Sequence, residues 1–200
     1  FGSNPTLVSS HASAYSLGLS QQNVIPTAKH FPGHGDTLED SHLITPTRNI
    51  SIGDLFARDL IPYQKFSSDF PNSAIMLGHV LFPKVDAVFP ATYSKKIVTN
   101  LLRERMSYNG MVITDDLEMT GASQFGSIGE RAVQAILAGA DLCMIGWNPH
   151  SQREAVRAVF RAVKNRTISM ERIDQSITRI LVAKKRLVQN LPEPQISRTV

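Results

Sequence analysis

The chain contains 200 residues, of which 42% are hydrophobic, so it can bury the core of one globular domain. Its 21 basic and 17 acidic residues give a formal net charge of +4, and the basic residues are too dispersed to form the stripe that binds nucleic acid. No run resembles a transmembrane span or a signal peptide, so we expect neither a nucleic-acid nor a membrane partner.

Apolar spacing and turn signals predict alternating helices and strands. Asn4 before Pro5 is a helix-start signal, and Asn109-Gly110 is a turn signal. In chain order, we expect a helix over residues 4–21, a strand over 24–28, a helix that opens at 51–54, a strand over 74–79, a helix over 94–106, a strand over 111–114, a helix over 130–137, a strand over 141–145, and helices over 150–163 and 170–187. Residues 189–200 contain two prolines and no apolar pattern, which predicts an extended tail.

Strands separated by helices predict an α/β fold with a parallel sheet. Three of the four strands end in titratable residues: Lys29-His30 follow the first, His79 ends the second, and Asp115 follows the third. Functional groups at the carboxyl ends of parallel strands are typical of a (β/α)8 barrel, the TIM barrel. Eight strand–helix units need about 250 residues, whereas this chain has only four strand patterns.

The densest group of titratable side chains lies in residues 29–42, with the sequence KHFPGHGDTLEDSH. This stretch holds three of the six histidines, together with two glycines and one proline. It follows the first predicted strand, and a polar, glycine-punctuated loop that leaves a strand is where an α/β protein usually carries its chemistry. We therefore predict the functional site here.

The pattern KHFPGHGDTxxDSH closely resembles the signature of family 3 glycoside hydrolases, specifically the bacterial β-N-acetylglucosaminidases that trim cell-wall fragments. The segment MVITDDLEM at 111–119 is similar to the strand that carries the nucleophile of that family. The resemblance extends from Phe1 to about Leu187 and implies a TIM barrel with a further amino-terminal half. Residues 1–188 are therefore expected to form the carboxy-terminal part of the barrel and to need that half.

The resemblance implies a retaining exo-β-N-acetylglucosaminidase that releases terminal N-acetylglucosamine through a covalent glycosyl-enzyme. Its substrate would be a small carbohydrate, either a muropeptide from peptidoglycan or a chito-oligosaccharide. Single-domain relatives more commonly work in the cytoplasm on recycled wall fragments, although secreted relatives exist. The sugar preference rests on the resemblance alone.

Asp115 is the expected nucleophile, because a carboxylate at a strand end can attack an anomeric carbon. Adjacent residues of an extended chain face opposite ways, so Asp115 and Asp116 cannot both point into the barrel mouth. The alternative role of Asp115 is that of a helix N-cap. For the general acid, the resemblance points to His42 paired with Asp40, since imidazole titrates near neutral pH and a carboxylate can fix its tautomer. A solvated salt link between them is the alternative.

The family resemblance also implies that Lys29 and His30 bind the terminal sugar, although a histidine beside a strand is commonly a core residue. His79 ends its strand toward the same mouth and is a substrate-binding candidate that would act from behind the residues in contact with the sugar, and Met119 is a candidate for packing beneath the sugar. Core packing is the alternative for each. Glycines allow backbone torsions that fold a loop over a ligand. The residues expected to shape the loop are Gly33, His34, Gly35 and Asp36.

Other classes of function remain open. A metal-dependent hydrolase could use zinc ligands from the loop, namely His30, His34, Asp36, Asp40 and His42. The spacing His-x3-His suits a helix, but Pro32 and Gly33 interrupt it, so we predict no metal and no cofactor. A non-catalytic sugar-binding fragment, a family 3 β-glucosidase and a phosphorylase are the remaining alternatives. A neutral histidine in place of a catalytic carboxylate would suit a phosphorylase, because it repels anionic phosphate less.

Overall fold

The computed structural model describes residues 1–37 and 44–188. The predicted tail at 189–200 and the proposed pair Asp40 and His42 therefore lie outside the described residues. Within the described part of the chain, no helix is both long and apolar enough to cross a membrane.

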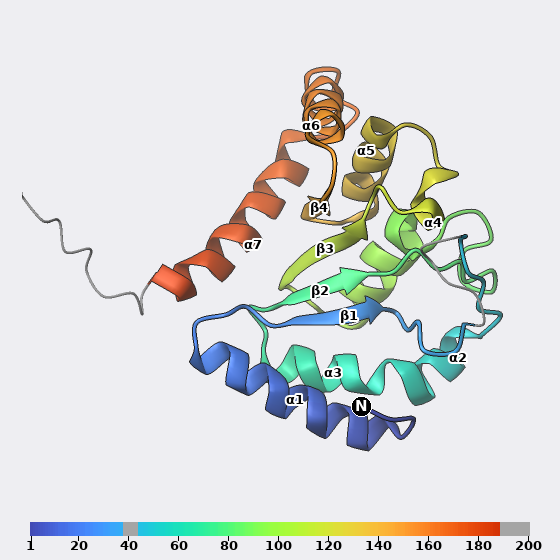
Figure 1. Ribbon diagram of the computed structural model, residues 1–200, viewed down its shortest axis with the longest axis vertical. Coiled ribbons are helices and arrows are strands. Elements are labelled where there is room, and N and C mark those ends of the chain that lie inside the picture. Colours follow the sequence, from blue (N-terminus) through green and yellow to red (C-terminus); the bar gives the residue numbers. More distant parts are fainter. Residues whose placement is uncertain (38–43, 189–200) are drawn as a thin grey trace, which may run out of the picture.

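Four parallel strands form one sheet in the order β1-β2-β3-β4 (Figure 1). They are β1 Thr27–Phe31, β2 Ala74–Leu77, β3 Met111–Asp116 and β4 Leu142–Met144. Each strand is separated from the next by helical segments, as the pattern of the sequence predicts. The predicted α/β fold with a parallel sheet is thus confirmed.

The predicted bounds of the first strand are wrong. We expected it over residues 24–28, but Val24 is 49% exposed and β1 begins at Thr27. The register with β2 pairs Thr27 with Ala74 and Phe31 with Leu77, and Phe31 is fully buried. Pairing and burial of Phe31, rather than the local apolar run, fix the strand. Lys29 and His30 therefore belong to the strand itself.

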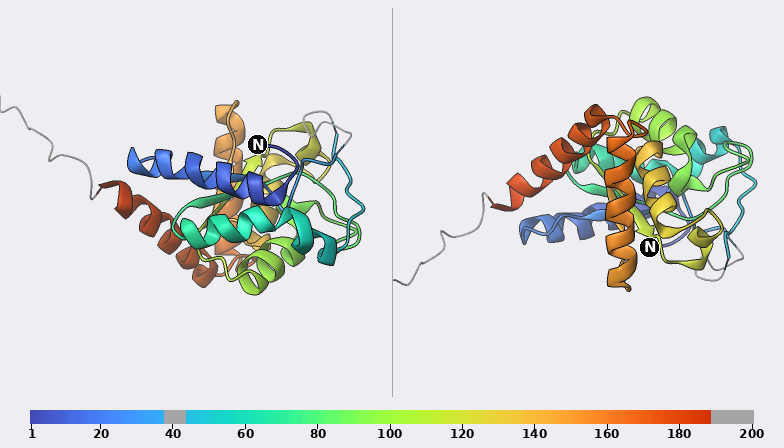
Figure 2. Two further views of the ribbon diagram at one scale, coloured as in Figure 1. Left: turned by 90° about the horizontal axis from the view of Figure 1, so that it is seen from below. Right: turned by 90° about the horizontal axis from the view of Figure 1, so that it is seen from above.

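Helices flank the sheet (Figures 1 and 2). Helix α1, Pro5–Gln21, begins as predicted, because the side chain of Asn4 accepts hydrogen bonds from the amides of Thr6 and Leu7. It packs on α3, Ile61–Asp69. The remaining α-helices are α2 Ile52–Asp54, α4 Thr120–Ser123, α5 Ile128–Ala138, α6 Pro149–Lys164 and α7 Met170–Val188. Helices α1 and α3 lie next to β1, and α5 and α6 lie beyond β4 (Figure 1).

Two predicted helices contain π-helical turns. The helix expected from residue 51 is divided into α2, the π-helical η1 Leu55–Asp59 and α3. The helix expected over 94–106 is the π-helix η3 Lys96–Arg105, which follows the short 3-10 helix η2 Ala91–Tyr93. Apolar spacing indicates that a helix is present, but it does not distinguish a π-helix from an α-helix of similar period.

A buried charge cluster lies at the amino edge of the sheet. Asp141 precedes β4, and its side chain is fully buried. Arg103, Arg172 and Arg179 all pair with this carboxylate. Its oxygens also accept hydrogen bonds from the hydroxyl of Ser176 and the amide of Val112. One carboxylate thus joins η3, β3 and α7.

Replacing Asp141 with Asn is expected to lower the free energy of unfolding by about 3–5 kcal/mol, because the arginines lose their buried counter-charge. Chemical denaturation followed by circular dichroism would measure the change. Asp174→Asn is a matched control on α7, since Asp174 is exposed and its substitution should change stability by less than about 0.5 kcal/mol. A loss below about 1 kcal/mol for Asp141→Asn would show that the cluster contributes little.

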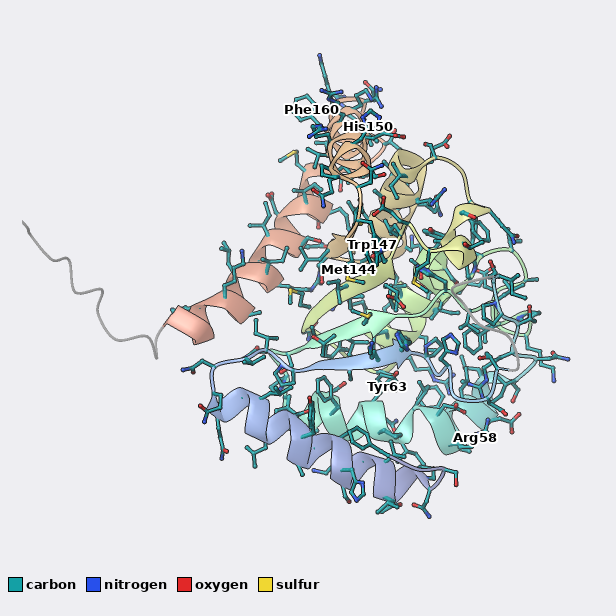
Figure 3. The ribbon with its side chains drawn as sticks, in the orientation of Figure 1. Arg58, Tyr63, Met144, Trp147, His150 and Phe160 are labelled. Atoms are coloured by element: carbon teal, nitrogen blue, oxygen red, sulfur yellow. The ribbon has the colours of Figure 1, made fainter. Side chains whose placement is uncertain are left out.

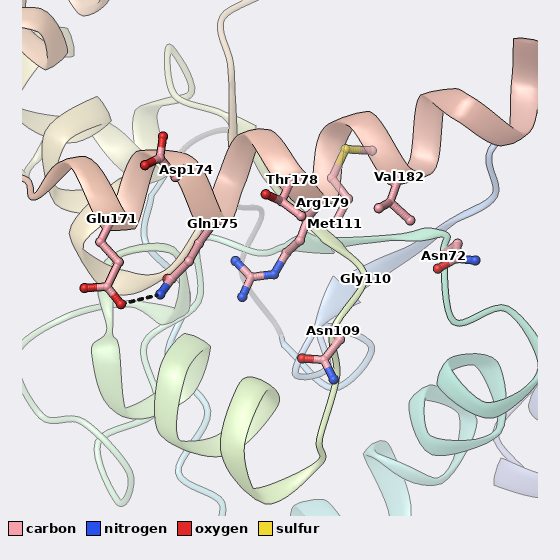
Figure 4. A pocket seen from close by; sticks show the side chains of 10 residues that line it. All are labelled: Asn72, Asn109, Gly110, Met111, Glu171, Asp174, Gln175, Thr178, Arg179 and Val182. Atoms are coloured by element: carbon pink, nitrogen blue, oxygen red, sulfur yellow. Dashed lines mark hydrogen bonds between the residues drawn. The ribbon is translucent and has the colours of Figure 1, made fainter.

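A hollow of about 680 Å³ lies at the same amino edge (Figure 4). Its lining comes from the loops before β2 and β3 and from α7, with Asn72, Asn109, Met111, Gln175, Thr178 and Arg179 among the residues. Barrel enzymes carry their chemistry at the carboxyl edge of the strands. Size alone therefore does not make this hollow the candidate site.

Candidate active site

Strands β1 and β3 bring His30 and Asp115 together at the carboxyl edge of the sheet. The Nε2 atom of His30 lies 3.3 Å from Oδ2 of Asp115, although β2 separates the two strands. Gly78, directly after β2, makes this approach possible, because a Cβ atom there would lie 3.1 Å from Cβ of His30. The peptide bonds Lys29–His30 and Phe31–Pro32 are both cis.

The two adjacent carboxylates of β3 have different surroundings. The side chain of Asp115 is 15% exposed and faces His30, and its Oδ1 accepts a hydrogen bond from the amide of Asp116. Asp116 is buried and accepts hydrogen bonds from the amides of Glu118 and Gly146. The different partners agree with the opposite orientation of neighbouring strand residues, and Asp115 is the one that faces His30.

His30 is neutral at pH 7. Burial lowers its pKa to about 4, even though the charge of Asp115 acts in the opposite direction. A neutral imidazole with its proton on Nε2 can donate toward Asp115 without protonating it. The ring of His34 meets the ring of His30 edge to face, with 5.6 Å between their centroids. The contact with His30 holds the carboxylate of Asp115 in one orientation.

The side chain of His79 is fully buried and both ring nitrogens have partners, so it lies behind the candidate site rather than on its surface. Nδ1 lies 2.8 Å from the hydroxyl of Thr92, and Nε2 lies 3.0 Å from the carbonyl oxygen of Asp116. Burial lowers the pKa of His79, so the ring is neutral. Nε2 donates to the carbonyl of Asp116, while the hydroxyl of Thr92, which lies beside Nδ1, also donates to the carbonyl of Gly78. His79 supports the backbone of β3.

Arg48, which no sequence pattern indicated as a site residue, holds the start of the histidine loop in place. Its guanidinium donates to the carbonyl of Gly33, to Asp59 and to Asp36, and the side chain is 2% exposed. Arg58 also donates to Asp36, and hydrogen bonds from Arg58 and Arg48 hold the pKa of that carboxyl below its usual value. The loop is therefore joined to η1.

Only one of the two loop glycines is required by the described structure. Gly33 has a φ of +148°, and a Cβ atom there would lie 2.7 Å from Oδ1 of Asp59. Gly35 has no positive φ and no atom within 4 Å of an added Cβ, so this conformation does not require a glycine there. The hydroxyl of Thr37 lies 2.8 Å from Nδ1 of His34, which closes a local turn.

The other site residues lie around this centre. Lys29 is exposed on β1, and Met119 is half-buried directly before α4. Within residues 1–37 and 44–188, no three His, Cys, Asp or Glu side chains are grouped so that they could hold a metal ion. Two of the five zinc ligands considered from the sequence, Asp40 and His42, are outside those ranges.

The loop after β4 also lies at this edge, although none of its residues was predicted to belong to the site. Trp147 is the single tryptophan of the chain and is 84% exposed. Its amide and that of Asn148 both donate to Oε2 of Glu118. The available signal was an aromatic residue shortly after a predicted strand, at the edge that carries Asp115.

Residues 1–183 match the family model described as the N-terminal domain of glycosyl hydrolase family 3. The chain belongs to glycosyl hydrolase family 3. The N-terminal domains of this family are of the TIM-barrel type, so the parallel sheet with its flanking helices is of that fold class. The expected family and fold class are thereby confirmed.

Three relatives illustrate the match. A β-hexosaminidase of Methylococcus capsulatus is 36% identical over 169 residues, which are 84% of this chain and 49% of that protein. The structure of a family 3 β-N-acetylglucosaminidase from Paenibacillus sp. str. FPU-7 has a TM-score of 0.85 at 40% identity and covers 90% of this chain and 34% of that one. The structure of the β-glucoside phosphorylase BglX bound to 2FGlc has a TM-score of 0.80 at 28% identity. The match covers 88% of this chain and 33% of that one. The chain spans about half the length of the curated relatives it matches.

Proposed function

We propose that the family 3 protein carrying this chain is a retaining exo-β-N-acetylglucosaminidase that acts through a covalent intermediate on Asp115. The observation that carries the proposal is the Asp115 carboxylate, which projects from the carboxyl end of β3 and lies 3.3 Å from the neutral His30. The names of the hexosaminidase and acetylglucosaminidase relatives support the choice of sugar. The proposed substrates are muropeptides or chito-oligosaccharides, met in the cytoplasm.

In the proposed first step, Asp115 attacks the anomeric carbon while an acid protonates the departing oxygen. We assign that acid to His42, with Asp40 holding its tautomer, on the resemblance of residues 29–42 to the family signature. In the second step, His42 takes a proton from water, which displaces Asp115 and restores the β configuration. Lys29 and His30 hold the terminal sugar.

The matched residues make up 49% and 42% of two curated relatives. We therefore include in the proposal that a further, amino-terminal half of the barrel completes the site. That half would supply the remaining wall of the sugar pocket, opposite the edge formed by β1 to β4. All activity measurements proposed below use the protein at its full natural length.

The configuration of the first product tests the mechanism. Proton NMR of a fresh reaction is expected to show the β-anomer before mutarotation, because two displacements at one carbon restore its configuration. A slow 2-deoxy-2-fluoro glycoside should label Asp115, detected by mass spectrometry of the digested protein. Appearance of the α-anomer first would mean direct attack by water and would exclude Asp115 as the nucleophile.

Phosphorolysis is the second candidate, and the likeness to a β-glucoside phosphorylase favours it. The first step would be the same, but phosphate rather than water would attack the glycosyl-enzyme. The product would then be a sugar 1-phosphate of retained configuration. Phosphorus NMR of a reaction with inorganic phosphate distinguishes the two, because hydrolysis leaves the phosphate signal unchanged.

A further inference from the structure

Trp147 lies on the segment between β4 and α6, directly beyond the carboxyl end of β4. Figure 3 labels it near Met144, the last residue of that strand. Met144 pairs with Asp116 in the register of β3 and β4. The segment therefore leaves the sheet beside the strand end that carries Asp115, and at the same edge.

The backbone around Trp147 is fastened to the segment that follows Asp115. The amide of Gly146 donates to Asp116 over 3.2 Å, and the amide of Trp147 donates to Glu118 over 2.8 Å. A Cβ atom at Gly146 would lie 2.9 Å from Oδ2 of Asp116, so the two segments are in close contact. Asp115 and Glu118 are three residues apart, so their Cα atoms are separated by at most about 11 Å.

The strand order places Trp147 and the sugar-binding pair on different sides of Asp115. Lys29 and His30 lie on β1, whereas Trp147 follows β4, and β3 with Asp115 lies between these outer strands. In the proposed mechanism, the terminal sugar binds toward Lys29 and His30. In the proposed arrangement, the leaving group is bonded to the carbon that Asp115 attacks, and from there it extends toward Trp147.

The exposure of Trp147 suits a sugar ring. Among the described residues, Trp147 is 84% exposed, although the amides of Gly146 and Trp147 are held by the carboxylates of Asp116 and Glu118. A β-linked hexopyranose carries its substituents around its rim and presents C–H groups on its faces. Flat aromatic side chains with a polar N–H bind such mixed surfaces well.

We propose that Trp147 stacks on the leaving-group sugar and thereby selects substrates whose leaving group is a β-linked pyranose. The inference rests on the proposed glycosidase function and deepens it, because it assigns the ligand of a second subsite. Trp147 takes no part in proton transfer or bond formation. It holds the leaving-group sugar at the mouth of the barrel while Asp115 reacts.

The test compares two substrates that transfer the same sugar. One is the β-linked disaccharide of N-acetylglucosamine, and the other is N-acetylglucosaminyl β-fluoride, whose leaving group has no ring. Trp147→Ala should reduce kcat/KM for the disaccharide about tenfold, the effect of losing one aromatic contact, and for the fluoride at most about twofold. Trp147→Phe retains a ring and should recover most of the disaccharide rate.

Phe160→Ala is the matched control, because Phe160 is another exposed aromatic residue, 69% exposed, but lies on α6. It should leave the ratio of the two rates at the wild-type value. Equal losses on both substrates for Trp147→Ala, or no loss on either, would overturn the inference while leaving the glycosidase proposal intact. A wild-type protein that cleaves neither substrate would refute the proposed function, and the inference would fall with it.

Discussion

Replacing Asp115 with Ala is expected to lower turnover by about 10⁴–10⁶-fold, the scale on which the loss of a covalent nucleophile acts. The loss should be similar for a dinitrophenyl glycoside and for a disaccharide, because no proton transfer can replace the attacking oxygen. Steady-state rates on both substrates measure it. Added azide should restore part of the activity and yield an α-glycosyl azide, since it attacks once, from the face that Asp115 vacates.

The adjacent carboxylate provides the control. Asp116→Asn retains one of the two oxygens that accept from the amides of Glu118 and Gly146, so one of these hydrogen bonds loses its acceptor. We expect a stability loss of about 1–3 kcal/mol, with activity falling far less than for Asp115→Ala. If Asp116→Asn instead abolished turnover and Asp115→Ala retained it, the assignment of the two residues would have to be reversed.

His42→Ala should affect substrates according to how much their leaving group needs a proton. A disaccharide leaves as an alkoxide of high pKa, and its turnover should fall about 10²–10⁴-fold, the range for general acid catalysis. Dinitrophenolate leaves unaided, so its first step should persist and hydrolysis should stop at the glycosyl-enzyme. Stopped-flow absorbance should then show a burst of dinitrophenolate followed by a slow phase.

Asp40→Asn is the milder companion of this variant, because the imidazole remains while its tautomer loses support. As for His42→Ala, the loss of turnover should be larger for the disaccharide than for the dinitrophenyl glycoside, but both losses should be smaller. Equal losses on good and poor leaving groups for His42→Ala, without a burst, would assign the acid to another residue.

The sequence predicted much of the fold because strand pairing and helix spacing leave local patterns. The buried runs at Ala74–Leu77 and Met111–Asp116 were recognisable, as was the alternation of Asp115 and Asp116. Strand β1 was misplaced, because Val24 and Ile25 are apolar while Lys29 and His30 are polar. Only the pairing with β2 and the burial of Phe31 show where the strand lies.

The parts of the site whose residues are close in the sequence were predictable. Contacts between residues far apart in the sequence were not. Arg48 is 15 residues from Gly33, and Asp36 and Asp59 flank it, so no local pattern indicated their network. His79 ends its strand at the predicted edge, but the direction of its ring depends on Thr92 and on the carbonyl of Asp116. Such contacts follow from packing, which spacing does not encode.

The cluster around Asp141 and the carboxylate of Asp115 lie at opposite edges of the same sheet. Substitutions around the mouth can therefore accumulate without disturbing the ion pairs that fasten α7 and η3 to the strands. Such a division allows an enzyme lineage to change its substrate by small steps, each of which leaves the protein folded. A library that varies Trp147 and its neighbours while keeping Asp141 and its three arginines would be a suitable starting point for altering selectivity in the laboratory.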